Sequence, residues 1–160
     1  MKRILAPILL LTLLFPALAF GETMKDLVKR DGIHYKKFSD VPFTGKVTGE
    51  WLGTIINGRK ESSWVRYWSE GKLREKVTYK GGYEHGPYVA YHSNGQLWMK
   101  TTYKNSAMDG PFERYYANGQ LDSKGTYKYG NMEGAWVGFD RNGTPEPLWT
   151  GNFHRGNKIK

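Results

Sequence analysis

Cysteine is absent from the whole 160-residue sequence. That absence excludes a disulfide framework, a zinc site built from thiolates and a cysteine nucleophile. It also excludes a lipid attached to a cysteine behind an N-terminal leader, so an exported form of the chain is expected to be soluble. Phosphate-binding loops and nucleophile motifs are missing, and the four histidines lack the spacing of a metal site. We therefore expect no enzymatic activity, no cofactor and no metal.

Negative charge is in short supply. Against 24 lysines and arginines there are 15 aspartates and glutamates, which gives a formal charge of +9. The excess is spread along the chain, so we expect no nucleic-acid partner. It indicates either a solvated basic surface or a surface that attracts anionic partners.

The one long apolar run lies at the N-terminus. Two basic residues precede apolar residues 4–15, and Ala17 and Ala19 occupy the small-residue positions of a cleavage site. A run of about 12 residues is short against the roughly 20 that a membrane-spanning helix needs. We predict a signal peptide over residues 1–19, with Gly21 as the alternative cleavage point, and a periplasmic or secreted mature chain.

A 24-residue period organises the rest of the chain. Glycine recurs at this step at positions 71, 95, 119 and 143 and again at 86, 110 and 134. Aromatic residues fill the columns 64/88/112/136, 67/91/115/139 and 79/103/127. A fixed period of this length is typical of a repeat architecture.

Each repeat has the pattern of a β-hairpin. Asn-Gly pairs at 94–95, 118–119 and 142–143 separate aromatic-rich runs, as in a two-residue type I′ turn with positive φ at both central residues. We predict first strands at 64–69, 88–93, 112–117 and 136–141, and returning strands at 72–80, 96–104 and 120–128. The glycines at 86, 110 and 134 are expected to begin the connections between hairpins.

These patterns predict an all-β fold: an elongated array of antiparallel β-hairpin repeats in which neighbours bury each other's apolar sides. An N-terminal cap is expected over residues 22–42 and the repeat domain over 43–158. The alignment of residues 55–58 with 79–82 indicates a partial first unit. The expected units are 43–61, 62–85, 86–109, 110–133 and 134–158.

Alternation along the returning strands separates two faces. The buried face is expected to hold Leu73, Val77 and Tyr79 of the first returning strand, Leu97, Met99 and Tyr103 of the second, and Leu121 and Tyr127 of the third. The other face is expected to hold Lys76, Lys80, Lys100, Lys104, Lys124 and Lys128, with Trp98 among them.

Two interpretations of the lysine face are open. Equivalent lysines would stand roughly 10 Å apart, two strand spacings, and could meet lipid headgroups or an acidic polymer. They would equally keep an exposed sheet soluble without any ligand. Trp98 is either a contact for a protein or glycan, or a packing residue.

The segments Gly-Pro-Tyr-Val-Ala-Tyr-His-Ser-Asn-Gly-Gln-Leu at 86–97 and Gly-Pro-Phe-Glu-Arg-Tyr-Tyr-Ala-Asn-Gly-Gln-Leu at 110–121 resemble the MORN repeat in its bacterial variant form. The resemblance covers residues 43–158. It implies a hairpin array of a kind linked to membrane association and protein assembly. Residues 29–35 and 41–45 also resemble the start of bacterial YwqK-type antitoxins. The sequence thus suggests an exported module that binds a protein or an anionic partner, or an antitoxin or immunity protein that neutralises one toxin.

Overall fold

The computed structural model describes residues 21–159, and the predicted signal peptide over residues 1–19 lies outside that range. Strands make up almost all of its regular structure, with one short 3-10 turn at Met24–Asp26. The strands before the central repeats are β1 (Glu22–Thr23), β2 (Leu27–Arg30), β3 (Ile33–Lys36), β4 (Gly45–Thr48) and β5 (Trp51–Ile56). The others are β6 (Arg59–Tyr67), β7 (Leu73–Lys80), β8 (Tyr83–Tyr91), β9 (Leu97–Lys104), β10 (Ala107–Met108), β11 (Gly110–Tyr115), β12 (Leu121–Lys128), β13 (Asn131–Gly138), β14 (Gly151–His154) and β15 (Asn157–Ile159).

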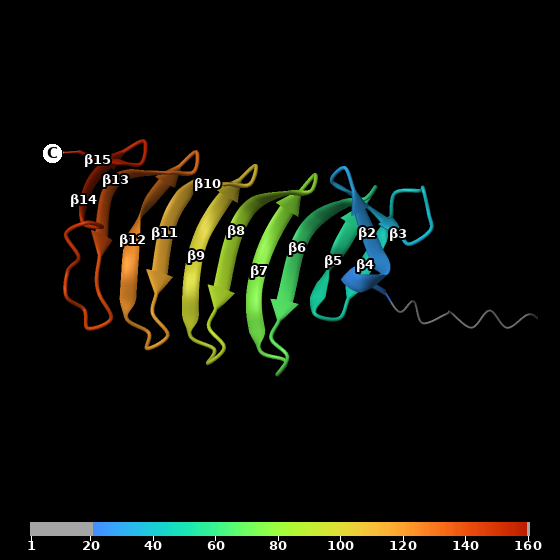
Figure 1. Cartoon of the computed structure of the whole chain (residues 1–160), viewed down its shortest axis with the longest axis horizontal. Coiled ribbons are helices and arrows are strands. Elements are labelled where there is room, and N and C mark those ends of the chain that lie inside the picture. Colours follow the sequence, from blue (N-terminus) through green and yellow to red (C-terminus); the bar gives the residue numbers. More distant parts are fainter. Residues whose placement is uncertain (1–20, 160) are drawn as a thin grey trace, which may run out of the picture.

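The main sheet follows the order of the chain. From β4 to β15 consecutive strands pair antiparallel, except that the short β10 pairs only with β9 and β11 pairs with β9 directly. The strand β1 adds a parallel edge beside β4, and β2 pairs with β3 in a separate hairpin. Figure 1 shows the strands side by side in one long row. The predicted all-β array of antiparallel hairpins is confirmed.

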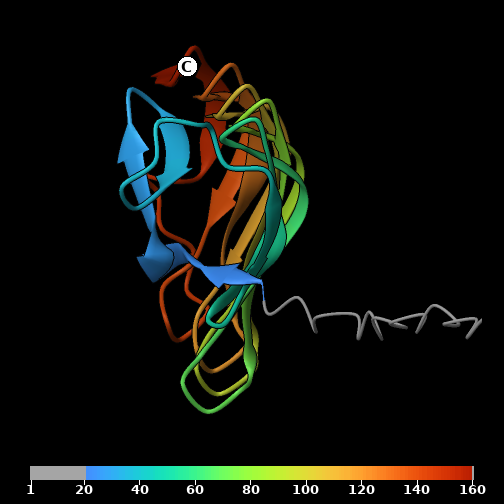
Figure 2. The ribbon, with the colours of Figure 1, turned by 90° about the vertical axis from the view of Figure 1, so that its right-hand side faces the viewer.

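The sheet is curved, and its concave face carries the buried core. Figure 2, which looks along the row, shows the β2–β3 hairpin standing on the hollow side. Leu27 of that hairpin packs into one buried cluster with Trp64 and Val77. A second cluster joins Met99, Phe112, Trp136 and Phe153. We call this side the hollow face and the opposite side the outer face.

The β2–β3 hairpin is fastened to the array through His34. The backbone N–H of His34 donates to the carbonyl oxygen of Gly58 at 2.9 Å, and its ring Nδ1 lies 2.9 Å from the same oxygen. The backbone N–H of Phe43 in turn donates to the carbonyl of His34 at 2.9 Å. Burial lowers the pKa of the His34 ring, so the neutral imidazole is favoured at this junction.

Tight two-residue turns join the strands at one of their two ends, which is the top of Figure 1, and we call this side of the sheet the tight-turn edge. Both central residues have positive φ in the turns Asn57-Gly58, Gly81-Gly82, Asn105-Ser106, Tyr129-Gly130 and Arg155-Gly156. That is the geometry of type I′ turns, whose twist matches antiparallel strands. The turn Asn57-Gly58 corresponds to Gly81-Gly82, as the predicted alignment of residues 55–58 with 79–82 requires.

The three Asn-Gly pairs predicted as hairpin turns, at 94–95, 118–119 and 142–143, lie in longer loops at the other ends of the strands, which we call the loop edge, and the prediction of type I′ turns there is wrong. In the loop 92–96 only Gly95 has positive φ. The Gly95 N–H donates to the His92 carbonyl at 2.9 Å, and the Asn94 side chain accepts from the Gln96 N–H at 3.1 Å. The asparagine thus stabilises its own backbone turn and leaves the left-handed position to the glycine.

Because the Asn-Gly loops are longer than two-residue turns, the strand ends also differ from the prediction. The predicted returning strands agree with β7, β9 and β12 to within one residue. The predicted first strands run too far into the loops, since β6, β8 and β11 end at Tyr67, Tyr91 and Tyr115. The observed strands also begin earlier than predicted: β6 and β8 start directly after tight turns, and β11 starts at Gly110 behind the short β10.

The glycines expected to begin connections lie inside strands, which corrects that prediction. Gly86 has φ +115° within β8, and a Cβ there would stand 3.3 Å from Cβ of Thr78. Gly110 repeats this arrangement against Thr102, also at 3.3 Å. Both glycines allow the strand to bulge while it passes close to its neighbour.

A second bulge shifts side chains between the faces. Ala90 pairs with Met99 and Tyr91 with Leu97, which leaves Trp98 as an extra residue. The same irregularity recurs in the hairpins of β6–β7 and β11–β12. Paired residues share a face, so Leu73, Leu97 and Leu121 lie on the outer face with Tyr67, Tyr91 and Tyr115. Their predicted place on the buried face is wrong, because the bulge interrupts the simple alternation.

Candidate functional site

The lysines of three strands form one row across the outer face. Lys76 of β7 lies opposite Val89, which lies opposite Lys100 of β9. Lys100 in turn lies opposite Glu113, which lies opposite Lys124 of β12. Equivalent lysines are therefore two strands apart on one face, a separation of roughly 10 Å.

Glu113 interrupts the positive row. Its carboxylate lies 2.8 Å from Nζ of Lys100 and 3.1 Å from Nζ of Lys124, and the Tyr115 hydroxyl donates to it at 2.6 Å. The hydrogen bond from Lys100, followed by that from Tyr115, lowers the pKa of Glu113 to about 2. The same contact raises the pKa of Lys100. Two of the six predicted lysines therefore share one counter-charge.

The other four lysines are free of such partners. Lys80, Lys104 and Lys128 end their strands just before the tight turns, and with Lys76 they are exposed. Within residues 21–159 none of these four forms an ion pair. The unpaired positive charge of the outer face therefore lies along the tight-turn edge, at the ends of β7, β9 and β12, and at Lys76 within β7.

Three carboxylates recur at the repeat step, a column that was not predicted from the sequence. Glu61 accepts from the Gly81 N–H at 2.7 Å, Asp109 from the Tyr129 N–H at 3.2 Å and Glu133 from the Arg155 N–H at 3.0 Å. The backbone hydrogen bond lowers the pKa of Glu133. Each carboxylate holds the next tight turn, so this column is structural.

Lys60 is a half-buried cation on the hollow face. Its ammonium lies 4.5 Å from the ring centre of Trp51, 4.3 Å from Trp64 and 5.0 Å from Tyr79. Burial is the main cause that lowers its pKa. The three rings compensate the charge in part through cation–π contact, which closes this end of the core.

Trp98 lies on the hollow side, and its predicted place among the lysines is wrong. As the extra residue of a bulge it turns toward Ala90 and Glu75, which belong to the hollow face. It is 41% exposed and lines a hollow of about 370 Å³ together with Trp68, Arg74 and His92. In the sequence, the columns 68/92/116 and 74/98/122 at the 24-residue step could have indicated that these side chains lie together.

Two further hollows adjoin this one along the loop edge. A hollow of about 540 Å³ shares Trp68 and Arg74 as its wall. Another, of about 300 Å³, shares His92 and Trp98 and extends to Tyr116. We call the three hollows together the loop-edge groove.

Side chains stack in pairs along the loop-edge groove. The Arg74 guanidinium lies 4.3 Å from the ring centre of Trp68, and that of Arg141 lies 5.9 Å from Tyr116. The rings of His92 and Trp98 are 6.3 Å apart. Each pair separates one hollow from the next or closes the end of the series.

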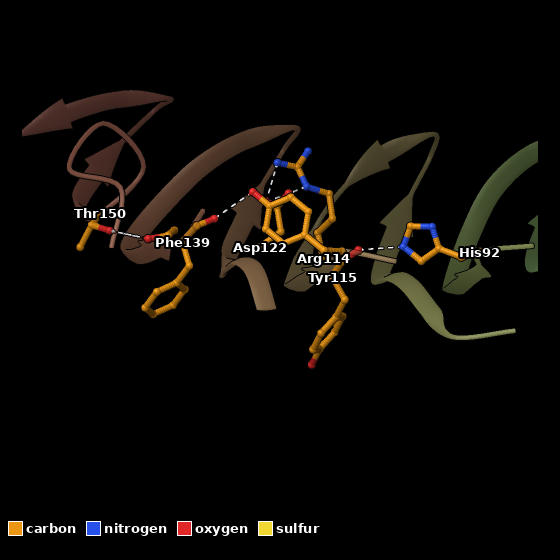
Figure 3. A network of polar contacts seen from close by, with 8 residues as sticks. His92, Arg114, Tyr115, Asp122, Phe139 and Thr150 are labelled. Carbon is orange, nitrogen blue, oxygen red and sulfur yellow. Dashed lines mark hydrogen bonds and ion pairs between the residues drawn. The ribbon is translucent and has the colours of Figure 1, made fainter. Parts of the chain in front are cut away.

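Hydrogen bonds tie consecutive repeats together below these pairs. Nε2 of His92 lies 2.9 Å from the Tyr115 carbonyl oxygen, and the Tyr116 hydroxyl donates to the Phe139 carbonyl at 2.9 Å. Figure 3 shows the contact between His92 and Tyr115, and the rings of Tyr115 and Phe139 pointing to the opposite side from the Arg114 side chain. In the same column, Nε1 of Trp68 is buried without a hydrogen-bond partner in the described part of the chain.

The acidic groups of the groove are already paired. Glu50 lies 2.6 Å from Arg66, and Asp122 lies 2.8 Å from Arg114. Glu75 accepts from the Tyr88 hydroxyl at 3.0 Å and lies 3.6 Å from Arg66. Arg74 and Arg141, in contrast, form no ion pair in the described range 21–159. Counted together with Arg66 and Arg114, four arginines stand against three carboxylates at the groove.

Comparison with known families reaches the centre of this array. Residues 60–80, 84–105 and 108–129 match the family model of the MORN repeat variant. The chain carries three MORN-type repeats. They span the strands that hold the lysine row and most of the loop-edge groove. The predicted last unit 134–158 lies outside the matched segments, and so does the predicted partial unit 43–61 apart from residues 60–61. No curated protein matches the chain.

Two other features bear on function. No helix within residues 21–159 has the length and apolar character to cross a membrane. In the same range, histidines and carboxylates do not gather in a group of three or more that could hold a metal ion.

Proposed function

We propose that the protein is an exported, non-enzymatic repeat module that binds a protein or an anionic partner through its outer face. The observation that carries the proposal is the placement of six lysines on that face, for which Glu113 is the one paired counter-charge among residues 21–159. A MORN repeat array supplies the frame that repeats these lysines at a constant step.

The physical basis is the summation of weak contacts. A lysine near an anionic membrane surface contributes about 1 kcal/mol, and exposed charges act over a distance of about 8 Å in physiological salt. Lys76, Lys80 and Lys104 have no ion pair to give up within the described chain. They can therefore engage an extended anion without losing an internal contact.

Removal of those three charges tests the proposal. The triple variant Lys76→Gln, Lys80→Gln and Lys104→Gln should lose about 3 kcal/mol, or roughly 100-fold, in binding to vesicles that contain phosphatidylglycerol. Co-sedimentation with these vesicles and with pure phosphatidylcholine vesicles measures the effect. The neutral vesicles should bind neither protein.

A matched control removes the same net charge elsewhere. The exposed residues Lys25, Lys29 and Lys37 lie in the N-terminal cap, and their replacement by glutamine should leave vesicle binding almost unchanged. Equal weakening in both triple variants would mean that overall charge alone governs binding. The outer face would then have no role of its own.

An antitoxin or immunity protein is the second candidate. It is supported by the resemblance of residues 29–35 and 41–45 to YwqK-type antitoxins, a segment that includes β3 and part of β2. This candidate requires a toxin gene beside the gene of this chain. The two purified products should then form a stoichiometric complex in size-exclusion chromatography, and a failure to co-elute would exclude the neighbour as the cognate toxin.

A further inference from the structure

We propose that the loop-edge groove is a binding site for a linear glycan that carries carboxylate groups. The groove lies on the hollow side of the sheet, whereas the lysine rows lie on the outer face. The proposal therefore stands apart from the function proposed above. It rests on three features of the groove: its step, its aromatic walls and its charge.

The step of the groove suits an extended polymer. One hollow falls between each two consecutive loops, and consecutive loops are two strands apart, or roughly 10 Å. This distance is similar to the length of two linked pyranose rings. A straight glycan could therefore present an equivalent sugar face to each hollow in turn.

The aromatic walls suit sugar rings. Trp98 offers an exposed flat apolar face to the groove, and Trp68 and Tyr116 stand on either side of it as half-buried walls that each carry an arginine. The faces of pyranose rings carry apolar C–H groups and are bordered by hydroxyls, so they stack on such side chains. Trp98 keeps 41% of its surface exposed in a position where the bulge frees it from the strand pairing.

The free charge selects an acidic glycan. Arg74 and Arg141 hold their guanidinium groups over aromatic rings, and no carboxylate of the described residues pairs with them. A guanidinium binds a carboxylate with two parallel hydrogen bonds, and stacking fixes its plane for that contact.

An extended peptide fits the same groove less well. Peptides that bind along sheets do so through free backbone groups of an edge strand. Here the loop carbonyls of Tyr115 and Phe139 already accept hydrogen bonds from His92 and Tyr116. Side-chain stacking is therefore the main contact that the groove offers.

Titration calorimetry with oligomers of alginate, a polyuronate, tests the proposal. We expect the full chain to bind them, and Trp98→Ala to weaken binding about tenfold or more, as truncation of a central aromatic contact does. Trp149→Ala is the matched control, since Trp149 is 47% exposed but lies outside the groove. Circular dichroism should show that both variants keep the fold.

Charge and polymer class are tested separately. Neutral cello-oligosaccharides of equal length should bind more weakly than alginate, and the double variant Arg74→Gln, Arg141→Gln should abolish that difference. Poly-glutamate tests the peptide. If it binds as tightly as alginate and its binding is lost in Trp98→Ala, the groove takes a peptide and the proposal is overturned.

Two further results would also overturn it. One is the absence of alginate binding by the folded wild-type chain. The other is alginate binding that Trp98→Ala leaves intact but that the outer-face lysine variant removes. The second result would assign the polyanion to the outer face and would leave the function proposed above standing.

Discussion

Replacement of Gly125 by alanine should destabilise the protein through a single contact. An added Cβ at Gly125 would lie 2.2 Å from Cδ2 of Trp136, far inside van der Waals contact. Trp136 is only 3% exposed and cannot swing out into solvent without leaving its cluster. The backbone of Gly125 has no positive φ, so the effect is purely steric.

The expected magnitude combines three contributions. Overpacking of a closed core costs about 1–3 kcal/mol. Displacement of Trp136 also breaks the hydrogen bond from its Nε1 to the Thr126 carbonyl, 3.1 Å long, which is worth about 1 kcal/mol. Alanine restricts the unfolded chain more than glycine and returns about 0.4–1 kcal/mol. The free energy of unfolding should fall by about 2–3 kcal/mol and Tm by about 5–10 °C.

Urea unfolding followed by tryptophan fluorescence and circular dichroism measures the change. The double variant Gly125→Ala, Trp136→Phe should lose about 1–2 kcal/mol less than the sum of the single variants, because a smaller ring leaves room for the Cβ. Thr101→Ala is the control: it occupies the same column, and its buried hydroxyl has no hydrogen-bond partner within residues 21–159. A stability of Gly125→Ala equal to or above wild type would refute the reasoning.

Two more predictions follow from the turns and from the outer face. Tyr129 has φ +52° and is 70% exposed in a tight turn. Because glycine adopts this backbone conformation without strain, Tyr129→Gly should raise the free energy of unfolding, measured by urea titration, by about 1 kcal/mol. A loss of stability would mean that the contacts of the Tyr129 ring outweigh the strain of its backbone. The depressed pKa of Glu113, about 2 against an ordinary 4.5, means that its stabilisation is complete above pH 4.5 and disappears as pH falls toward 2. Wild type and Glu113→Gln should therefore differ in stability at neutral pH and converge over that interval, and a constant difference down to pH 2 would contradict the ion pairs with Lys100 and Lys124.

The repeat period was sufficient to predict the architecture. Columns of aromatic residues at a fixed step can be buried only if each unit has the same shape, and the clusters around Trp64 and Trp136 show that arrangement. The row of Lys76, Lys100 and Lys124 follows from the period together with alternation, because these residues lie beyond the bulge. Glu113 could not be placed in that row from one strand alone, since its contacts depend on the register of β11 between β9 and β12.

The turns show where local sequence signals mislead. Asn94-Gly95 has the composition of a type I′ turn, whereas Tyr129-Gly130 does not, yet only the latter pair adopts that geometry. A contact from the neighbouring unit stabilises this turn: Asp109 accepts from the Tyr129 N–H. A two-residue motif cannot predict the contribution of Asp109, because Asp109 lies twenty positions before Tyr129 in the chain.

The side-chain sizes in two columns compensate each other, a pattern that is visible in the sequence alone. Glycine stands at 53 and 125 eleven residues before Trp64 and Trp136, whereas Val77 and Thr101 stand eleven residues before Tyr88 and Phe112. The indole of Trp64 would meet a Cβ on Gly53 at 2.2 Å, as Trp136 would on Gly125. The largest ring is thus accepted only where the opposing strand has no side chain.

The bulge separates the two tasks of each repeat. On either side of it the pairs Tyr91–Leu97 and Ala90–Met99 keep the strands in register, so the residue between them is released from pairing. That residue is arginine at 74, tryptophan at 98 and aspartate at 122, while the leucine before it is constant at 73, 97 and 121. Because the frame does not depend on the released side chain, the lining of the groove can differ from repeat to repeat without a cost in pairing. Chemical variety along the loop-edge groove is therefore what we expect of a recognition surface built on an invariant scaffold.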